Sequence, residues 1–176
     1  MAGPDYIKPR ERHDGPIFLA TYDSEWAVTY DSLATAIRET LGETAVEVEH
    51  VGSTSVPGLD AKPIIDIDLI VPDTTDEVSY VGPLEGLGYE FILREPDWFE
   101  HRLLRHSEPP VNLHVFSTGC DEHTRMIAFR DRMRADDAMR DRYRDAKREL
   151  SGRTWAYVQD YADAKSGVIR EILAQL

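Results

Sequence analysis

Cysteine is nearly absent from this sequence, and the long apolar runs of membrane proteins are missing. The one cysteine, Cys120, cannot form a disulfide within the chain, which is typical of proteins from a reducing compartment. No apolar run approaches the length of a membrane-spanning helix, and residues 1–15 are polar, without a signal-peptide core. We therefore expect a cytoplasmic protein with no membrane partner.

Positive charge is also scarce. The chain has 20 Lys and Arg against 33 Asp and Glu, which gives a net charge of −13. A surface that binds nucleic acid needs a basic face, so we expect no nucleic-acid partner. A small anionic substrate remains compatible, because a few local cations and a metal ion are enough to hold it. Of the 176 residues, 41% are hydrophobic and 30% charged, which suits one domain with a buried core.

The first strong periodicity is helical. Apolar side chains recur at spacings of three and four from Trp26 to Leu41, which predicts a helix with one buried face. Asp23 or Ser24 is a natural N-cap for this helix, and Gly42 is placed to end it.

The rest of the chain predicts a sheet followed by helices. Apolar and alternating runs predict strands at 45–51, 64–71, 89–93, 98–105 and 111–116, with a short helix at about 76–87 that Pro83 weakens. After Gly119 the periodicity predicts helices over 121–151, broken near 135–136, and from about 154 to the end. The charges between Arg130 and Arg148 indicate a solvated helical face with i,i+4 pairs.

This order of elements predicts an α/β or α+β fold in one domain, with a mixed sheet of four or five strands flanked by helices. Residues 1–16, which are rich in proline, glycine and charge, are expected to form a flexible lead-in. Residues 17–118 would form the sheet core, in which 17–20 are a short strand or an extended arm. Residues 119–176 would form a helical C-terminal part.

Two aspartates in the apolar strand at 64–71 are the clearest chemical signal. Side chains alternate along a strand, so Asp66 and Asp68 share one face, which they also share with Ile64 and Ile70. Two adjacent carboxylates repel each other, and a divalent cation would remove that conflict. We expect them to bind Mg²⁺ (or Mn²⁺), which prefers oxygen ligands. The alternative is the solvent-facing side of an edge strand.

The loop before this strand contains Gly52, Ser53, Thr54 and Ser55. Glycine permits a close approach of the backbone to a ligand, while serine hydroxyls and loop amides can hold phosphate oxygens. Beside a metal on the two aspartates, such a loop would position a triphosphate for attack on its α-phosphorus. An ordinary polar turn is the alternative.

The spacing of these two motifs resembles a known pattern. Twelve residues separate Ser53 from Asp66, and Gly-Ser followed at that distance by Asp-x-Asp on a strand resembles the nucleotidyltransferase superfamily. A longer match resembles the GrpB family, also called uncharacterised protein family 0157: residues 50–59 read HVGSTSVPGL and residues 61–67 read AKPIIDI. Shorter matches between residues 17 and 173 are Tyr22-Asp23, Trp26, Gly88-Tyr89, Leu113-His114-Val115, Phe129-Arg130-Asp131 and Lys165.

The resemblance implies a nucleotidyltransferase-like fold, and GrpB members also occur fused to dephospho-CoA kinase. Active transferases present a third carboxylate from a later strand, but residues 111–116 contain no Asp or Glu and carry His114 instead. His114 is therefore a candidate base or metal ligand. Equally, it could be a hydrogen-bonding histidine that holds the aspartates in place.

Three further cations are candidates for phosphate contact. Lys62 lies just before the aspartate strand, although it could be a surface lysine at a loop end. Arg102 and Arg105 could bind phosphate with the guanidinium fork or pair with acidic side chains. His50 is expected to support the loop.

The sequence thus predicts Mg²⁺-dependent transfer of a nucleotidyl group from a nucleoside triphosphate to a small-molecule acceptor. A protein that binds a nucleotide or metabolite without turnover is the first alternative, and the missing third carboxylate favours it. A metal-dependent phosphohydrolase that uses the same aspartates is the second.

Overall fold

The apolar run with two aspartates forms β3 (Ile65–Val71), an interior strand of a six-stranded mixed sheet. The computed structural model describes residues 3–175 of the chain. Across the sheet the strands follow the order β1 (Asp5–Tyr6), β4 (Glu90–Glu95), β5 (His101–His106), β6 (Val111–Ser117), β3 and β2 (Glu47–Val51). Only β3 and β6 run parallel, and the other neighbours are antiparallel. The predicted α+β class is confirmed.

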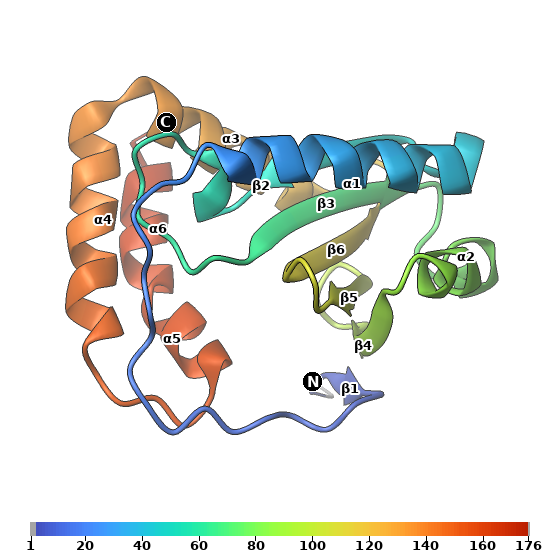
Figure 1. The fold of residues 1–176 in the computed structure, drawn as a ribbon, viewed down its shortest axis with the longest axis horizontal. Helices are drawn as coiled ribbons and strands as arrows, with labels where there is room; N and C mark the ends of the chain where they lie inside the picture. The colour runs from blue at the N-terminus through green and yellow to red at the C-terminus, as the bar shows by residue number, and fades with distance from the viewer. Residues whose placement is uncertain (1–2, 176) are drawn as a thin grey trace.

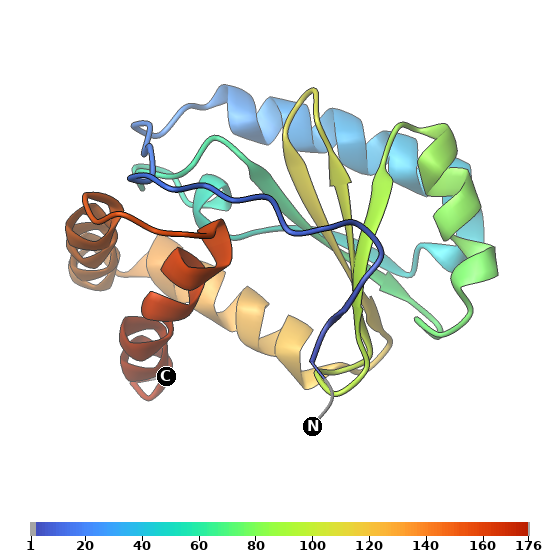
Figure 2. The same ribbon diagram turned by 90° about the horizontal axis from the view of Figure 1, so that it is seen from below.

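One face of the sheet is packed against α1 (Glu25–Leu41) and α2 (Val81–Gly86) (Figure 1, Figure 2). The apolar side chains of β3 on this face, Ile67 and Leu69, are fully buried beneath Ala34 and Ile37 of α1. The predicted first helix and its end at Leu41 are confirmed. Since β3 alternates, its aspartates project from the opposite face.

That opposite face lies toward the helical C-terminal part (Figure 2). This part consists of α3 (Asp121–Ala135), α4 (Asp137–Ser151), α5 (Val158–Ala164) and α6 (Ser166–Leu173). The expected break falls at Asp136, whose carboxylate accepts a hydrogen bond from the Met139 amide at 3.1 Å and caps α4. A second apolar cluster joins Met133, Tyr143 and Ile172 of these helices to Val56 and Leu59 of the loop before β3.

The structure differs from the sequence prediction in three elements. The strand expected at 98–105 is β5, which begins only at His101. The expected helix at 76–87 is divided into a 3₁₀ turn, η3 (Glu77–Ser79), and the short α2. Pro83 lies in the first turn of α2, where a missing N–H costs nothing. The last helix begins at Val158 rather than near 154 and is divided at Lys165. The other short turns are η1 (Gly42–Thr44) and η2 (Ser53–Ser55).

The N-terminal segment runs along the body of the protein (Figure 1). Residues 5–6 pair with β4 as an edge strand, so part of the expected lead-in extends the sheet; residues 1–2 lie outside the described part. Gly15 pairs with Trp155 of the helical part, and Ala20 pairs with Ala61 of the loop. The expected arm at 17–20 therefore ties the loop to the rest of the chain.

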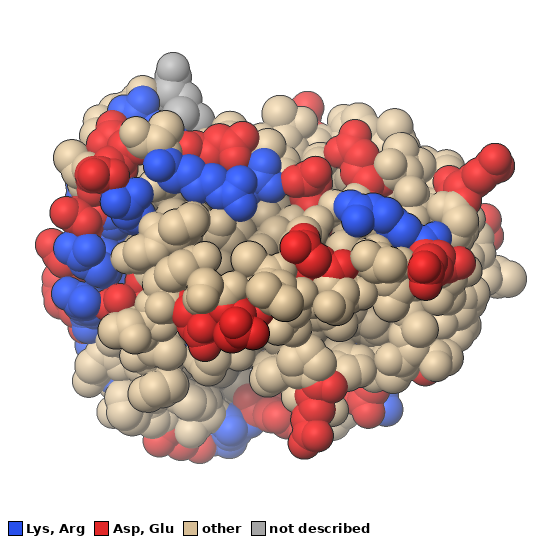
Figure 3. Space-filling view, turned by 45° about the horizontal axis from the view of Figure 1, so that its top comes forward, with Lys and Arg blue, Asp and Glu red and all other residues tan. Residues whose placement is uncertain are grey.

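Basic and acidic side chains are interleaved over the helical C-terminal part, and the side drawn in Figure 3 has no continuous basic face. Arg140 pairs with Asp137, and Arg144 pairs with Asp141. This matches the expected solvated face for part of α4. Within residues 3–175, no helix combines the length and apolarity that a membrane crossing requires.

Candidate functional site

Asp66 and Asp68 lie on one face of β3, as the alternation predicts. In the register of the sheet, Asp66 lies opposite Asn112 of β6, and Asp68 lies opposite His114. The environments of the two carboxylates differ, because the Asp66 side chain is 29% exposed and that of Asp68 is 0% exposed. The structure thus gives one carboxylate that faces a cavity and one that is enclosed.

Gly52 brings the loop against Asp66. Its backbone has φ 68° and ψ −169°, a conformation that only glycine adopts readily. A Cβ at this position would lie 2.4 Å from Oδ2 of Asp66. The glycine therefore permits both the loop conformation and the contact with the carboxylate.

The other polar residues of the loop divide into two roles. Ser55 donates a hydrogen bond to the Gly52 carbonyl at 2.6 Å, and Thr54 shares one of 3.0 Å with His50; both loop side chains are buried. These contacts hold the loop in shape, and the expected supporting role of His50 is confirmed through Thr54. Ser53 differs, because its hydroxyl accepts a hydrogen bond from Lys147 at 3.0 Å.

Asp66 is held ionised by its neighbours. Burial opposes its charge, but the nearby His114 and the amide of Asn112 outweigh this effect and lower the pKa of Asp66. Nδ2 of Asn112 donates to Oδ1 of Asp66 at 2.9 Å, and Nε2 of His114 lies 3.8 Å from the same oxygen. His114 therefore reaches the aspartates, as expected for either of its proposed roles.

Asp68 is held by a residue from the helical part. Burial raises the pKa of Asp68, partly offset by a hydrogen bond of 2.8 Å between its Oδ2 and Nδ1 of His123 in α3. Nε2 of His123 lies 3.2 Å from Glu47, so the imidazole bridges two carboxylates and its pKa is raised, chiefly by Asp68. Oδ1 of Asp68 is buried and has no hydrogen-bond partner among the described residues.

A chain of hydrogen bonds leads away from His114. Its Nδ1 lies 3.0 Å from Nε2 of His101, and Nδ1 of His101 lies 2.8 Å from a Glu95 carboxylate oxygen. Burial lowers the pKa of His101 to about 4, so this imidazole is neutral at pH 7. A neutral His101 that donates to Glu95 must accept from His114, which fixes a proton on Nδ1 of His114.

The two aspartates fit a metal that a ligand would complete. Within residues 3–175, no three His, Cys, Asp or Glu side chains form a group that could hold a metal by themselves. Mg²⁺ in nucleotide sites is bound by one or two carboxylates together with phosphate oxygens. The unpartnered Oδ1 of Asp68 and the partly exposed carboxylate of Asp66 match that smaller donor set.

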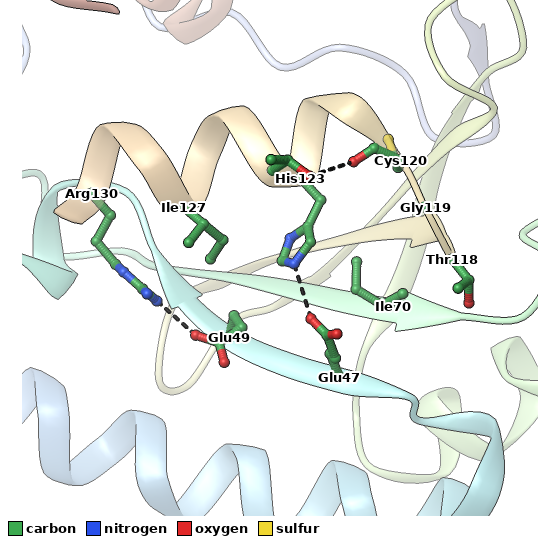
Figure 4. Close-up of a pocket in the computed structure, with 10 residues that line it drawn as sticks. Glu47, Glu49, Ile70, Thr118, Gly119, Cys120, His123, Ile127 and Arg130 are labelled. Carbon is green, nitrogen blue, oxygen red and sulfur yellow. Dashed lines mark hydrogen bonds and ion pairs between the residues drawn. The ribbon is translucent and has the colours of Figure 1, made fainter. Parts of the chain in front are cut away.

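A groove lies between β2 and α3 (Figure 4). Its volume is about 370 Å³, and its lining includes Glu47, Glu49, Ile70, Cys120, His123 and Arg130. Arg130 pairs with Glu49 at 2.7 Å and crosses the groove from the helix to the strand. His123 forms part of the wall and contacts Asp68 behind it, so the groove is one hydrogen bond away from the aspartates.

A second, smaller cavity of about 40 Å³ lies at the start of β3. Three lysines line it: Lys62 from the loop, Lys147 from α4 and Lys165 from the junction of α5 and α6. The other polar residues of its wall are Ser53, Thr54, Asp66, Asn112 and Tyr161. The structure therefore brings together Lys62, the loop and the first aspartate, as the sequence predicts.

Comparison with known proteins places the chain in a family. The family model described as GrpB protein matches residues 16–175. The chain belongs to the GrpB family. A UPF0157 protein of Halalkalibacterium halodurans is 52% identical over 167 residues, which are 95% of this chain and 84% of that protein. The crystal structure of conserved protein GrpB from Enterococcus faecalis has a TM-score of 0.72 and 29% identity, covering 90% of this chain and 98% of that one.

A third similarity concerns a longer protein. A dephospho-CoA kinase of Mycolicibacterium paratuberculosis is 25% identical over 191 residues, which cover 94% of this chain and 47% of that protein. Nearly the whole GrpB chain thus corresponds to less than half of this relative.

Arg102 is the predicted site residue that lies apart from the others. It is opposite Val115 in the register of the sheet and so projects from the face that α1 and α2 cover. Its guanidinium donates to Glu77 at 2.7 Å and to the Glu100 carbonyl at 2.8 Å. In this GrpB chain Arg102 therefore pairs with an acidic side chain, which is the alternative to phosphate binding.

Several residues of the GrpB site were not predicted from the sequence, among them His123, Lys147 and Asn112. One signal existed for Lys147, which follows Tyr143 at a spacing of four on the apolar stripe of α4. A lysine on such a stripe must point into the protein or bend away from it. Asn112 stands two residues before His114 and thus on the same face of β6. Nothing in the sequence around His123 indicates that it reaches Asp68.

Proposed function

We propose that this GrpB protein is a Mg²⁺-dependent nucleotidyltransferase, which moves a nucleotidyl group from a nucleoside triphosphate to a small acceptor. The contact of Gly52 with Asp66 carries the proposal, because it sets a loop with serine hydroxyls and backbone amides directly against a carboxylate that can bind a metal. The dephospho-CoA kinase relative supports a nucleotide-related role, since kinases use nucleoside triphosphates.

The residues of the site would bind the metal and the phosphates separately. Asp66 and Asp68 would hold Mg²⁺ (or Mn²⁺), which when bound neutralises phosphate charge and aligns the α-phosphorus for displacement of pyrophosphate. The Ser53 hydroxyl and the Lys62 ammonium would hold phosphate oxygens, because both groups line the cavity beside Asp66. Thr54 and Ser55 would act through the shape of the loop.

His114 is the candidate group for proton transfer. A proton taken up at its Nε2 can be balanced by passing the Nδ1 proton to His101, which in turn passes its own to Glu95. The two hydrogen bonds, of 3.0 and 2.8 Å, are short enough for each transfer. In this way His114 could accept the proton of the acceptor without a lasting charge beside the substrate.

The acceptor would occupy the groove between β2 and α3. Its volume of about 370 Å³ lies within the range of small-molecule sites. His123 in the groove wall is hydrogen-bonded to Asp68, so an acceptor in this groove would lie one residue away from a candidate metal ligand.

Binding of a nucleotide without turnover is the second candidate. The face of β6 that adjoins β3 carries Asn112 and His114 where active transferases have a third carboxylate. This observation favours a degenerate member of the superfamily, so turnover has to be measured as well as binding.

The test is calorimetric titration of ATP, GTP, CTP and UTP with and without Mg²⁺. Wild type would be compared with Asp66→Asn, Asp68→Asn and the control Asp31→Asn, which changes an exposed carboxylate on α1. We expect at least one nucleotide to bind in the presence of Mg²⁺, and either site variant to lose that binding while the control retains it. Equal binding by folded site variants, or no binding by wild type, would refute the proposal. Pyrophosphate release with candidate acceptors then separates transfer from binding alone.

A further inference from the structure

The three lysines of the small cavity come from distant parts of the chain. Lys62 precedes β3, whereas Lys147 and Lys165 belong to the helical C-terminal part. Lys147 is 1% exposed, and the other two are half-buried. Folding therefore concentrates three cations in one small space, in a chain whose net charge is −13.

These cations have no carboxylate partner close by. Among the described residues, no carboxylate oxygen lies within 4.0 Å of any of the three ammonium groups. The Lys147 ammonium donates only to neutral oxygens, the Ser53 hydroxyl and the Asp60 carbonyl. The Asp60 carboxylate is itself paired with Arg148 at 2.6 Å. Lys165 lies over the ring of Tyr161, at 4.6 Å from its centroid.

Such an arrangement is costly in the absence of a ligand. Burial, together with the charge of Lys165, lowers the pKa of Lys62 to about 8 and that of Lys147 to about 7. Asp66 opposes these shifts but is already engaged by Asn112. The charge of Lys165 disfavours the charges of Lys62 and Lys147, so the cluster gains most from an anion that all three can contact.

We propose that this cavity binds the terminal phosphate group of a polyphosphate chain. A single buried water needs about 10–15 Å³ of cavity volume. A cavity of about 40 Å³ therefore admits one phosphate group but not a nucleoside. The tetrahedral oxygens of phosphate can accept from three ammonium groups and the Ser53 hydroxyl together, and lysine binds phosphate as a point charge.

The position of Asp66 indicates in which direction the polyphosphate would leave the cavity. Among the described residues, Asp66 is the one carboxylate in the wall of the cavity, so the next phosphate would leave the lysines on the side of the candidate metal site. The assignment rests on the proposed function for the identity of the polyphosphate, which would be the triphosphate of a nucleotide. It also gives α4 and the junction of α5 and α6 a direct part in binding.

The test is titration calorimetry with inorganic phosphate, pyrophosphate and tripolyphosphate, in EDTA so that no metal contributes. Wild type would be compared with Lys147→Gln and Lys165→Gln, and with Lys8→Gln as a control on an exposed lysine. Thermal unfolding verifies that each variant is folded, and Lys165→Gln, which changes a half-buried side chain, covers the case in which Lys147→Gln does not fold. We expect pyrophosphate to bind wild type and the control, and to bind each site variant at least tenfold more weakly.

Three results would overturn the assignment: no binding of pyrophosphate by wild type, equal binding by the folded site variants, or inorganic phosphate binding as tightly as pyrophosphate. The outcome is independent of the nucleotidyltransferase test. Lysine-dependent pyrophosphate binding without Mg²⁺-dependent nucleotide binding would leave the phosphate cavity standing and refute the transferase. Nucleotide binding that needs Asp66 but neither Lys147 nor Lys165 would do the reverse.

Discussion

A Cβ added to Gly52 would lie 2.4 Å from Oδ2 of Asp66, so the loop and the strand are fitted to each other at this point. The loop conformation and the position of the Asp66 carboxylate therefore both depend on the absence of a Cβ at residue 52. Residues on the far side of the loop, Val56 and Leu59, are buried in the apolar cluster of the C-terminal helices. The loop cannot retreat from Asp66 without disturbing that cluster.

The first prediction concerns Gly52→Ala. We expect the free energy of unfolding to fall by about 1–3 kcal/mol, since alanine disfavours this backbone conformation, and Mg²⁺-dependent nucleotide binding to be lost. Gly82→Ala is the matched control, because Gly82 has open space around its Cβ position and lies in α2. Urea unfolding and calorimetry measure the two effects. Wild-type nucleotide affinity in Gly52→Ala would show that the contact with Asp66 has no part in binding.

The second prediction separates Arg102 from Lys62. Arg102→Met should lower the free energy of unfolding by about 1–3 kcal/mol, because Glu77 loses a charged partner, and should leave nucleotide affinity within about twofold. Lys62→Met should weaken nucleotide binding while changing stability little. The same calorimetric and unfolding measurements on both variants decide the matter. If Arg102→Met loses binding as Lys62→Met does, Arg102 acts in the site in spite of its position.

Sequence reasoning could predict those parts of the fold and the site that local periodicity determines. The two aspartates share a face because a strand has a period of two, and the loop before them is marked by its own glycine and serines. For the same reason the class of the fold and the first helix were predictable. The short edge strand at residues 5–6 was not, because two residues carry no periodicity and pair only because β4 is there.

The contributions of the C-terminal helices could not be predicted in the same way. His123 and Lys147 reach Asp68 and Ser53 across intervals of 55 and 94 residues. Such contacts depend on how α3 and α4 pack against the sheet, which no local pattern encodes. Arg102 illustrates the converse, since its residue type suits phosphate binding but its register on β5 turns it to the opposite face.

The third prediction concerns the link between His123 and Asp68. In His123→Ala the fully buried Asp68 loses its hydrogen-bond donor, so the free energy of unfolding should fall by about 3–5 kcal/mol. The double variant His123→Ala/Asp68→Asn should recover much of this loss, because the unpaired charge is removed, and His123→Gln should be less destabilised. Urea unfolding of wild type, His123→Ala, Asp68→Asn and the double variant forms a double-mutant cycle. Additive effects of the two substitutions would show that the pair is not coupled.

The last prediction is a gain in stability from a loss of function. In the unfolded chain Lys147 has its ordinary pKa of 10.5, and in the folded protein burial, together with Lys165, lowers this pKa to about 7 against the opposing charges of Asp60 and Asp66. Between these two values the unfolded state binds more protons, so this group makes stability rise with pH over that window. Lys147→Met lacks the penalty. The Tm of Lys147→Met should therefore exceed that of wild type at pH 6.5. The difference should be smaller at pH 9.5, where the folded lysine is neutral, and the variant should lose pyrophosphate binding at either pH.

The two hydrogen bonds from Lys147 to Ser53 and the Asp60 carbonyl offset part of the gain. A lower Tm at both pH values, measured by calorimetry in phosphate-free buffer, would mean that these bonds outweigh the buried charge and that the lysine cluster is stable without an anion.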